Sequence, residues 1–154
     1  MTGNEWEFHR KMAIDCYNHA WDLLDKKNRS EEDSLQMMHL AHASLYHWGP
    51  VGTPMNRPVG EWQLSRIYAG TGNPGLSLEF AKACVATCED NGLSEIAHTA
   101  DGAMARAYAV AKDHRHARRY LNIARRGLNK LTLGKEDRAV YLQQIKQTEA
   151  LTQE

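Results

Sequence analysis

An internal repeat constrains the fold of this chain more than any other feature of its sequence. A shift of 40 residues superimposes Arg66 on Arg106, Tyr68 on Tyr108, Ala69 on Ala109, Asn73 on Asp113 and Phe80 on Tyr120. Each unit has the pattern of a helix, a tight turn and a second helix. Self-similarity with a period of about 20–50 residues is typical of stacked supersecondary units. The repeat therefore predicts an all-α protein built from helical hairpins.

Helical spacing of apolar residues extends over most of the chain, and no segment alternates apolar and polar residues for long. Ser30, Asn73, Ser94 and Asp113 mark helix starts, because their side chains can accept a hydrogen bond from the first helical turn. We expect about seven helices, near residues 6–27, 31–47, 61–69, 74–90, 95–112, 114–131 and 135–150.

Three of the 4 prolines fall between residues 49 and 60. Proline fixes φ and lacks a backbone donor, so this segment is not expected to be helical. It also contains Val51, Met55 and Val59, which favour an ordered loop packed on the protein. The predicted organisation is a single domain, with a helix hairpin at 1–48, an ordered Pro/Gly loop at 49–60, two hairpins at 61–131 and a capping helix at 135–150.

The second unit resembles the tetratricopeptide repeat (TPR) family. That family places a large apolar residue, a small one and an aromatic one in its first helix, then a small, a large and a small residue in its second. The matching residues are Met104, Ala105 and Tyr108, followed by Ala117, Leu121 and Ala124. The preceding unit matches with Leu64, Ser65, Tyr68 and the turn residue Gly72, then Ser77, Ala81 and Cys84. The resemblance covers about residues 60–131, with a period longer than the family's ~34 residues.

The resemblance implies a right-handed stack of antiparallel helix hairpins, a TPR-like α-solenoid whose first helices line a concave groove. The groove implies protein binding, and the resemblance brings no catalytic residues. By the same logic, four residues are expected to face a partner groove: Trp62, Arg66, His98 and Asp101.

Composition narrows the classes of function. The chain has 19 basic and 19 acidic residues, so it has no overall attraction to nucleic acid or to an anionic membrane. No apolar run reaches the ~18 residues of a membrane span, and the acidic start lacks the form of a signal peptide. Cys84 and Cys88, four apart, are expected to be core residues. We expect a cytoplasmic protein without a membrane partner and without a cofactor.

Two further groups could bind a ligand. His39, His42 and His47 are close enough in sequence to hold zinc or nickel; the alternative is that His42 forms a hydrogen bond in a polar part of the core and His39 lies on the surface. Aromatic and charged residues around the predicted loop could form a small-ligand pocket or could pack the loop onto the hairpins: Trp48, Asn56, Arg57, Glu61, Trp62 and Arg66.

Six basic residues follow helical spacing along one face of the predicted helix at 114–131: Arg115, Arg118, Arg119, Arg125, Arg126 and Lys130. Such a stripe could meet an acidic partner or a nucleic acid backbone, and a solvated outer helix face has the same pattern. No aromatic residues interleave the arginines, which argues against binding of single-stranded nucleic acid.

These features favour a non-enzymatic interaction module or scaffold that binds a protein or peptide in its groove. The alternative is a small-ligand or metal-binding protein with its site at the His39, His42 and His47 helix end and the loop at 48–62. An enzyme ranks third, because His98 and Asp101 have no nucleophile beside them in the sequence. Nucleic-acid binding ranks fourth, and self-association through the ends of a short stack stays open.

Overall fold

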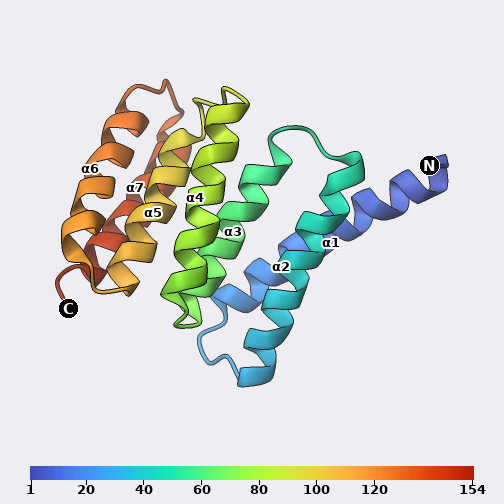
Figure 1. Cartoon of the computed structure of the whole chain (residues 1–154), viewed down its shortest axis with the longest axis horizontal. Helices are drawn as coiled ribbons and strands as arrows, with labels where there is room; N and C mark the ends of the chain where they lie inside the picture. The colour runs from blue at the N-terminus through green and yellow to red at the C-terminus, as the bar shows by residue number, and fades with distance from the viewer.

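The computed structural model describes residues 1–154 and is entirely helical. Its helices, all connected by short turns (Figure 1), are α1 (Gly3–Asp25), α2 (Glu31–Val51), α3 (Asn56–Gly70), α4 (Pro74–Asp90), α5 (Ala97–Val110), α6 (His114–Asn129) and α7 (Lys135–Leu151). The predicted all-α class is confirmed. No helix combines the length and the apolar character that a bilayer crossing requires.

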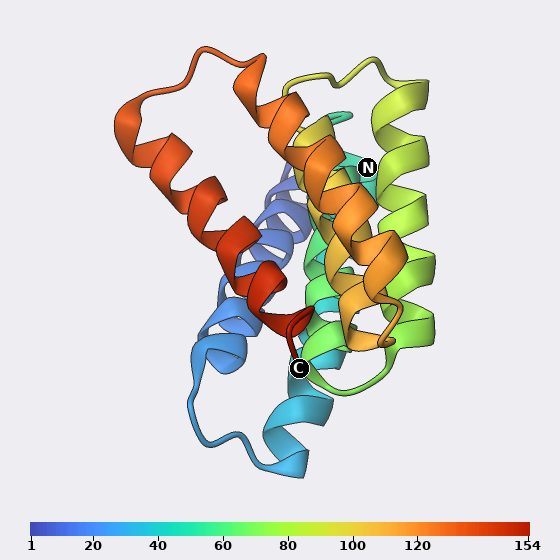
Figure 2. The same cartoon turned by 90° about the vertical axis from the view of Figure 1, so that its left-hand side faces the viewer.

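The helices pack in two layers. Each helix contacts the next one along the chain, and the odd-numbered helices also contact each other, α1 with α3, α3 with α5 and α5 with α7. The backbones of the even-numbered helices do not approach each other, although side chains meet between α2 and α4, where the ring centroids of His42 and Phe80 are 5.6 Å apart. Figure 2 shows α7 and α4 on opposite sides of the α5–α6 hairpin. The odd helices therefore form one continuous layer, which we call the odd-helix layer, and the even helices cover its other side.

Polar caps fix several of the helix starts. Ser30 accepts a hydrogen bond from the backbone of Asp33, whose side chain accepts one from Ser30 in return, which is a complete capping box. Asn73 and Asp113 cap α4 and α6 as expected. The expected cap at Ser94 is wrong: α5 begins at Ala97, because Leu93 and Ile96 pack against the buried cysteines of α4 and form a turn ahead of the helix.

The predicted loop at 49–60 is also wrong. The second helix continues through Trp48 and Pro50 to Val51, and α3 begins at Asn56. Pro50 lies in the last turn of α2, and Pro58 lies in the first turn of α3, where a missing N–H leaves no helical bond unmade. The side chain of Asn56 reaches back to accept a hydrogen bond of 2.7 Å from the Thr53 backbone. Between α2 and α3 only residues 52–55 are outside a helix. The first hairpin therefore extends to Val51 instead of residue 48, and the next begins at Asn56 instead of residue 61.

Small residues bring the helices close together. The hydroxyls of Ser65 in α3 and Ser77 in α4 each donate to the other's backbone carbonyl, at 2.9 and 2.8 Å. Small residues on the inner side of α5, including Ala103 and Ala107, are buried. Cys84 and Cys88 are buried core residues, as predicted. These close contacts hold α3, α4 and α5 together and thereby fix the orientation of α3 and α5 within the odd-helix layer.

Candidate functional site

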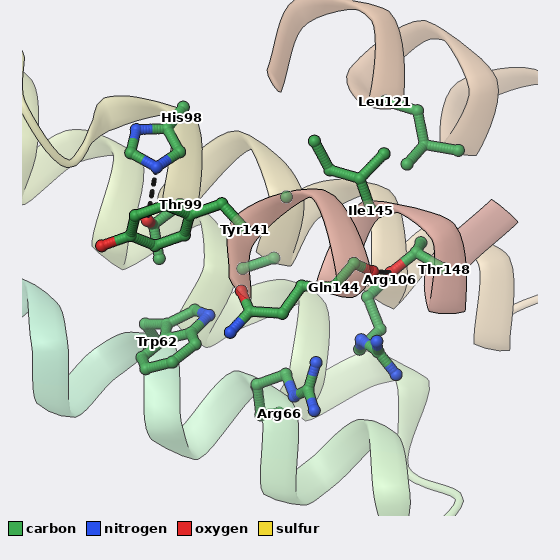
Figure 3. Close-up of a pocket in the computed structure, with 12 residues that line it drawn as sticks. Trp62, Arg66, His98, Thr99, Arg106, Leu121, Tyr141, Gln144, Ile145 and Thr148 are labelled. Carbon is green, nitrogen blue, oxygen red and sulfur yellow. Dashed lines mark hydrogen bonds between the residues drawn. The ribbon is translucent and has the colours of Figure 1, made fainter. Parts of the chain in front are cut away.

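A pocket opens in the odd-helix layer where α3, α5 and α7 meet (Figure 3). A water-sized sphere has about 20 Å³ of room inside it, and the atom-free space around this room, about 400 Å³, includes open solvent. Each helix contributes a stripe at helical spacing. These stripes are Trp62 and Arg66 from α3, His98, Gly102 and Arg106 from α5, and Tyr141, Gln144, Ile145 and Thr148 from α7. We call this the arginine pocket.

Arg66 and Arg106 point into the same part of the pocket (Figure 3). Neither forms an ion pair in the structure. The Nη2 atom of Arg106 is fully buried and has no hydrogen-bond partner. Burial, together with the neighbouring charge of Arg66, lowers the pKa of Arg106 to about 9. The 12 residues that line the pocket include no Asp or Glu, so two positive groups share a partly enclosed space without a negative one.

Aromatic rings surround Arg66. The ring of Trp21 in α1 lies 5.1 Å from that of Trp62, and the Arg66 guanidinium carbon is 6.0 Å from the Trp21 ring centroid. A guanidinium over an indole ring is attracted by the ring's negative face. Burial lowers the pKa of Arg66, and the charge of Asp25 acts in the opposite direction from beyond ion-pair distance. Arg66 thus has a cation–π contact with Trp21 and no ion pair with a carboxylate.

The last helix forms the remaining wall. Tyr141 meets His98 edge to face, with 4.5 Å between ring centroids. Ile145 and Thr148 are buried, and the Thr148 hydroxyl donates to the Gln144 carbonyl in its own helix. The Gln144 side chain forms no hydrogen bond of its own and lies between Trp62 and the two arginines in Figure 3. Residues of α7 therefore form one wall of the arginine pocket and place the neutral Gln144 amide on the same side as Arg66 and Arg106.

Three of the four residues expected in a partner groove, Trp62, Arg66 and His98, line the arginine pocket. Asp101 does not. It lies with Cys88 and Glu89 in a separate pocket between α4 and α5, where burial and the Glu89 charge raise its pKa to about 6. His98 and Asp101 therefore lie in different pockets.

The six residues expected to form one ligand pocket are divided between two places. Trp48, Asn56 and Arg57 line an open pocket at the α2–α3 corner, whereas Trp62 and Arg66 belong to the arginine pocket. Glu61 is buried beneath the corner and accepts a hydrogen bond of 2.9 Å from the exposed Arg57 side chain. The separation follows from helical geometry. Because α3 begins at Asn56, Asn56 and Arg57 lie on the same helix as Trp62 and Arg66 but point to a different side of it.

The predicted metal site at His39, His42 and His47 is not formed. The His42 Nε2 atom is 2.8 Å from the Tyr68 hydroxyl, and His47 pairs instead with His9 of α1 at 2.9 Å. His39 is exposed. No group of three or more His, Cys, Asp or Glu side chains in the structure has an arrangement that could hold a metal ion.

The six basic residues at the surface of α6, the basic stripe, are all exposed except the half-buried Arg125. Arg125 forms an ion pair with Glu149 of α7, so it helps to join the last two helices. The remaining members are Arg115, Arg118, Arg119, Arg126 and Lys130. They form a solvated outer face of the even-helix side, on the opposite side of α6 from its buried residues.

The residues at or beside the arginine pocket that were not singled out from the sequence as site residues include Trp21, Arg106, Tyr141 and Gln144. One signal for Arg106 was present, since it aligns with Arg66 in the 40-residue repeat. The contributions of α1 and α7 had no comparable signal.

No family model matches this chain, and no curated protein and no solved structure is significantly similar to it.

Proposed function

We propose that the protein is a non-enzymatic interaction module, a short TPR-like stack of helical hairpins that binds a segment of a protein partner against its odd-helix layer. The stacking is supported by the close backbone approach of the odd helices to each other, which the even helices lack. Such an arrangement curves a row of hairpins and makes the odd-helix layer the inner side.

The arginine pocket is the observation that carries the proposal. Aromatic rings and arginines are the side chains that most often dominate the energy of protein interfaces. Here Trp62, Tyr141 and the two arginines converge on one partly open pocket. The arginines lack internal partners, so a bound segment could supply what the chain itself does not.

Gly102 allows the proposal to be tested without disturbing the fold. It lines the pocket, and a Cβ built on it meets no atom within 4 Å. Leucine at this position extends into the pocket, whereas the same change at the exposed Gly3, which also has open space around it, leaves the pocket unaltered. A partner captured by the wild type and by Gly3→Leu, and lost by Gly102→Leu, supports the proposal. Equal capture by all three proteins contradicts it.

A small-ligand function is the second candidate, supported by the open pocket at the α2–α3 corner. Its polar groups are largely engaged within the chain, since the Asn56 side chain accepts a hydrogen bond from the Thr53 backbone and Arg57 pairs with Glu61. A thermal-shift panel of nucleotides, sugars and amino acids tests it, because a ligand that binds only the folded state raises its stability. A rise that Trp48→Ala abolishes favours this candidate, and a flat panel counts against it.

A further inference from the structure

The arginine pocket contains two positive side chains and no negative one, an imbalance of charge that folding alone does not explain. Arginine is rarely buried without a partner, because desolvation of the charge is unfavourable unless an anion or hydrogen-bond acceptors compensate. Arg106 has neither an ion pair nor an acceptor for its buried Nη2 atom. Arg66, close enough to repel it, adds a second uncompensated charge. Two charges of the same sign are therefore held together in a space that has no carboxylate of its own.

The geometry of the donors suits one kind of ligand. A guanidinium presents paired N–H groups that match the oxygens of a carboxylate or a phosphate. Arg66 and Arg106 approach the same part of the pocket from two helices, and the Gln144 amide from α7 lies beside them (Figure 3). The Trp62 ring provides an apolar wall next to the donors. The exposed basic stripe of α6 differs, because water and salt screen its charges.

We propose that Arg66 and Arg106 together bind a single oxyanion, a carboxylate or phosphate group, with the Gln144 amide as a neutral third donor. The oxyanion site is independent of any partner. Only the identity of its carrier, an acidic or phosphorylated segment of the bound protein, rests on the proposed function. The pocket would thereby select partner segments that present an oxyanion beside an apolar side chain.

Titration of the whole protein with inorganic phosphate and with acetate, each exchanged for chloride at constant ionic strength, tests the proposal. The melting temperature and tryptophan fluorescence are followed. We expect a saturable response to at least one anion, with phosphate alone or acetate alone identifying the preferred group. Arg66→Met and Arg106→Met keep the apolar stem and should each weaken the apparent affinity by at least about tenfold. Arg119→Met, at an exposed position of the basic stripe, should leave it unchanged.

The absence of a saturable response to either anion would overturn the proposal, as would an equal response of the wild type and Arg106→Met. Failure of the proposed function looks different: the anions bind and the arginine variants lose the response, while no partner is captured in a Gly102-dependent way. Conversely, a partner that Gly102→Leu loses and both arginine variants retain would leave the interaction module standing and refute the claim that the bound partner carries the oxyanion.

Discussion

Replacement of Arg106 by methionine is expected to stabilise the ligand-free protein. Burial and the charge of Arg66 lower the pKa of Arg106 from its ordinary value to about 9. Because the folded pKa lies below the unfolded one, the folded state disfavours the bound proton. The resulting penalty is fully present below pH ~9 and is relieved only as the pH rises toward the unfolded pKa.

The size of the effect follows from the same pKa difference. One pKa unit corresponds to about 1.4 kcal/mol, so the charged Arg106 destabilises the folded state by at most about 5 kcal/mol at pH 7.5. Methionine keeps most of the packed stem, but it gives up contacts of the guanidinium with the pocket wall. Replacements of buried charges by apolar residues of similar size often stabilise by about 1–4 kcal/mol. We expect a net gain of about 1–2 kcal/mol for Arg106→Met.

Urea unfolding at pH 7.5 in a chloride buffer free of phosphate and carboxylates measures this gain. A thermal scan should show a rise of about 2–4 °C for each kcal/mol in a chain of this length. The matched change Arg119→Met, at an exposed site without an ion pair, should lie within about 0.5 kcal/mol of the wild type. A lower urea midpoint for Arg106→Met than for the wild type would refute the reasoning, because it would mean that the charge is already compensated in the folded protein.

Three further changes test other parts of the structure. Gly102→Ala should stabilise by about 0.5–1 kcal/mol in urea unfolding, since alanine favours the helix and its Cβ has open space; any clear loss would mean that the pocket wall is closer than described. Asp101→Asn should stabilise by about 1 kcal/mol at pH 7.5, because a pKa raised to about 6 makes the ionised form unfavourable in the folded state. This gain should disappear as the pH falls through 6 toward 3.8, and a gain independent of pH would contradict the assigned cause. Tyr68→Phe removes the 2.8 Å contact with His42 and should cost about 1 kcal/mol; a double-mutant cycle with His42→Ala that shows no coupling would contradict this contact.

Local signals in the sequence specified much of the helical framework. Asn73 and Asp113 mark the starts of α4 and α6 because a side-chain cap acts within one turn of the chain. Pro50 and Pro58 misled the prediction. Proline is tolerated in the first turn of a helix, where Pro58 lies, and Pro50 lies so close to the end of α2 that it interrupts only the last turn. Their positions could be interpreted only once the ends of α2 and α3 were known.

The candidate site was only partly predictable, because it is assembled from four helices that are distant in sequence. The spacing His98, Gly102 and Arg106 follows one line along α5, whereas Asp101 lies off that line and faces α4. Asp101 is one residue from Gly102, an offset of about 100° around the helix, and this single step places it in the other pocket. Tyr141 and Gln144 could not be assigned to the site, because the position of α7 depends on its packing against α5 and α6.

The indole N–H signals of the 4 tryptophans give the most direct test that the odd-helix layer is the binding surface. Trp62 lines the arginine pocket and Trp21 stacks beside it, whereas Trp48 lines the α2–α3 corner and Trp6 is exposed near the start of α1. Proton–nitrogen spectra recorded during phosphate and acetate titrations should show saturable shifts of Trp62 and Trp21, with Trp6 and Trp48 unmoved. Shifts confined to Trp48, or no shift at Trp62, would contradict the assignment of binding to the arginine pocket.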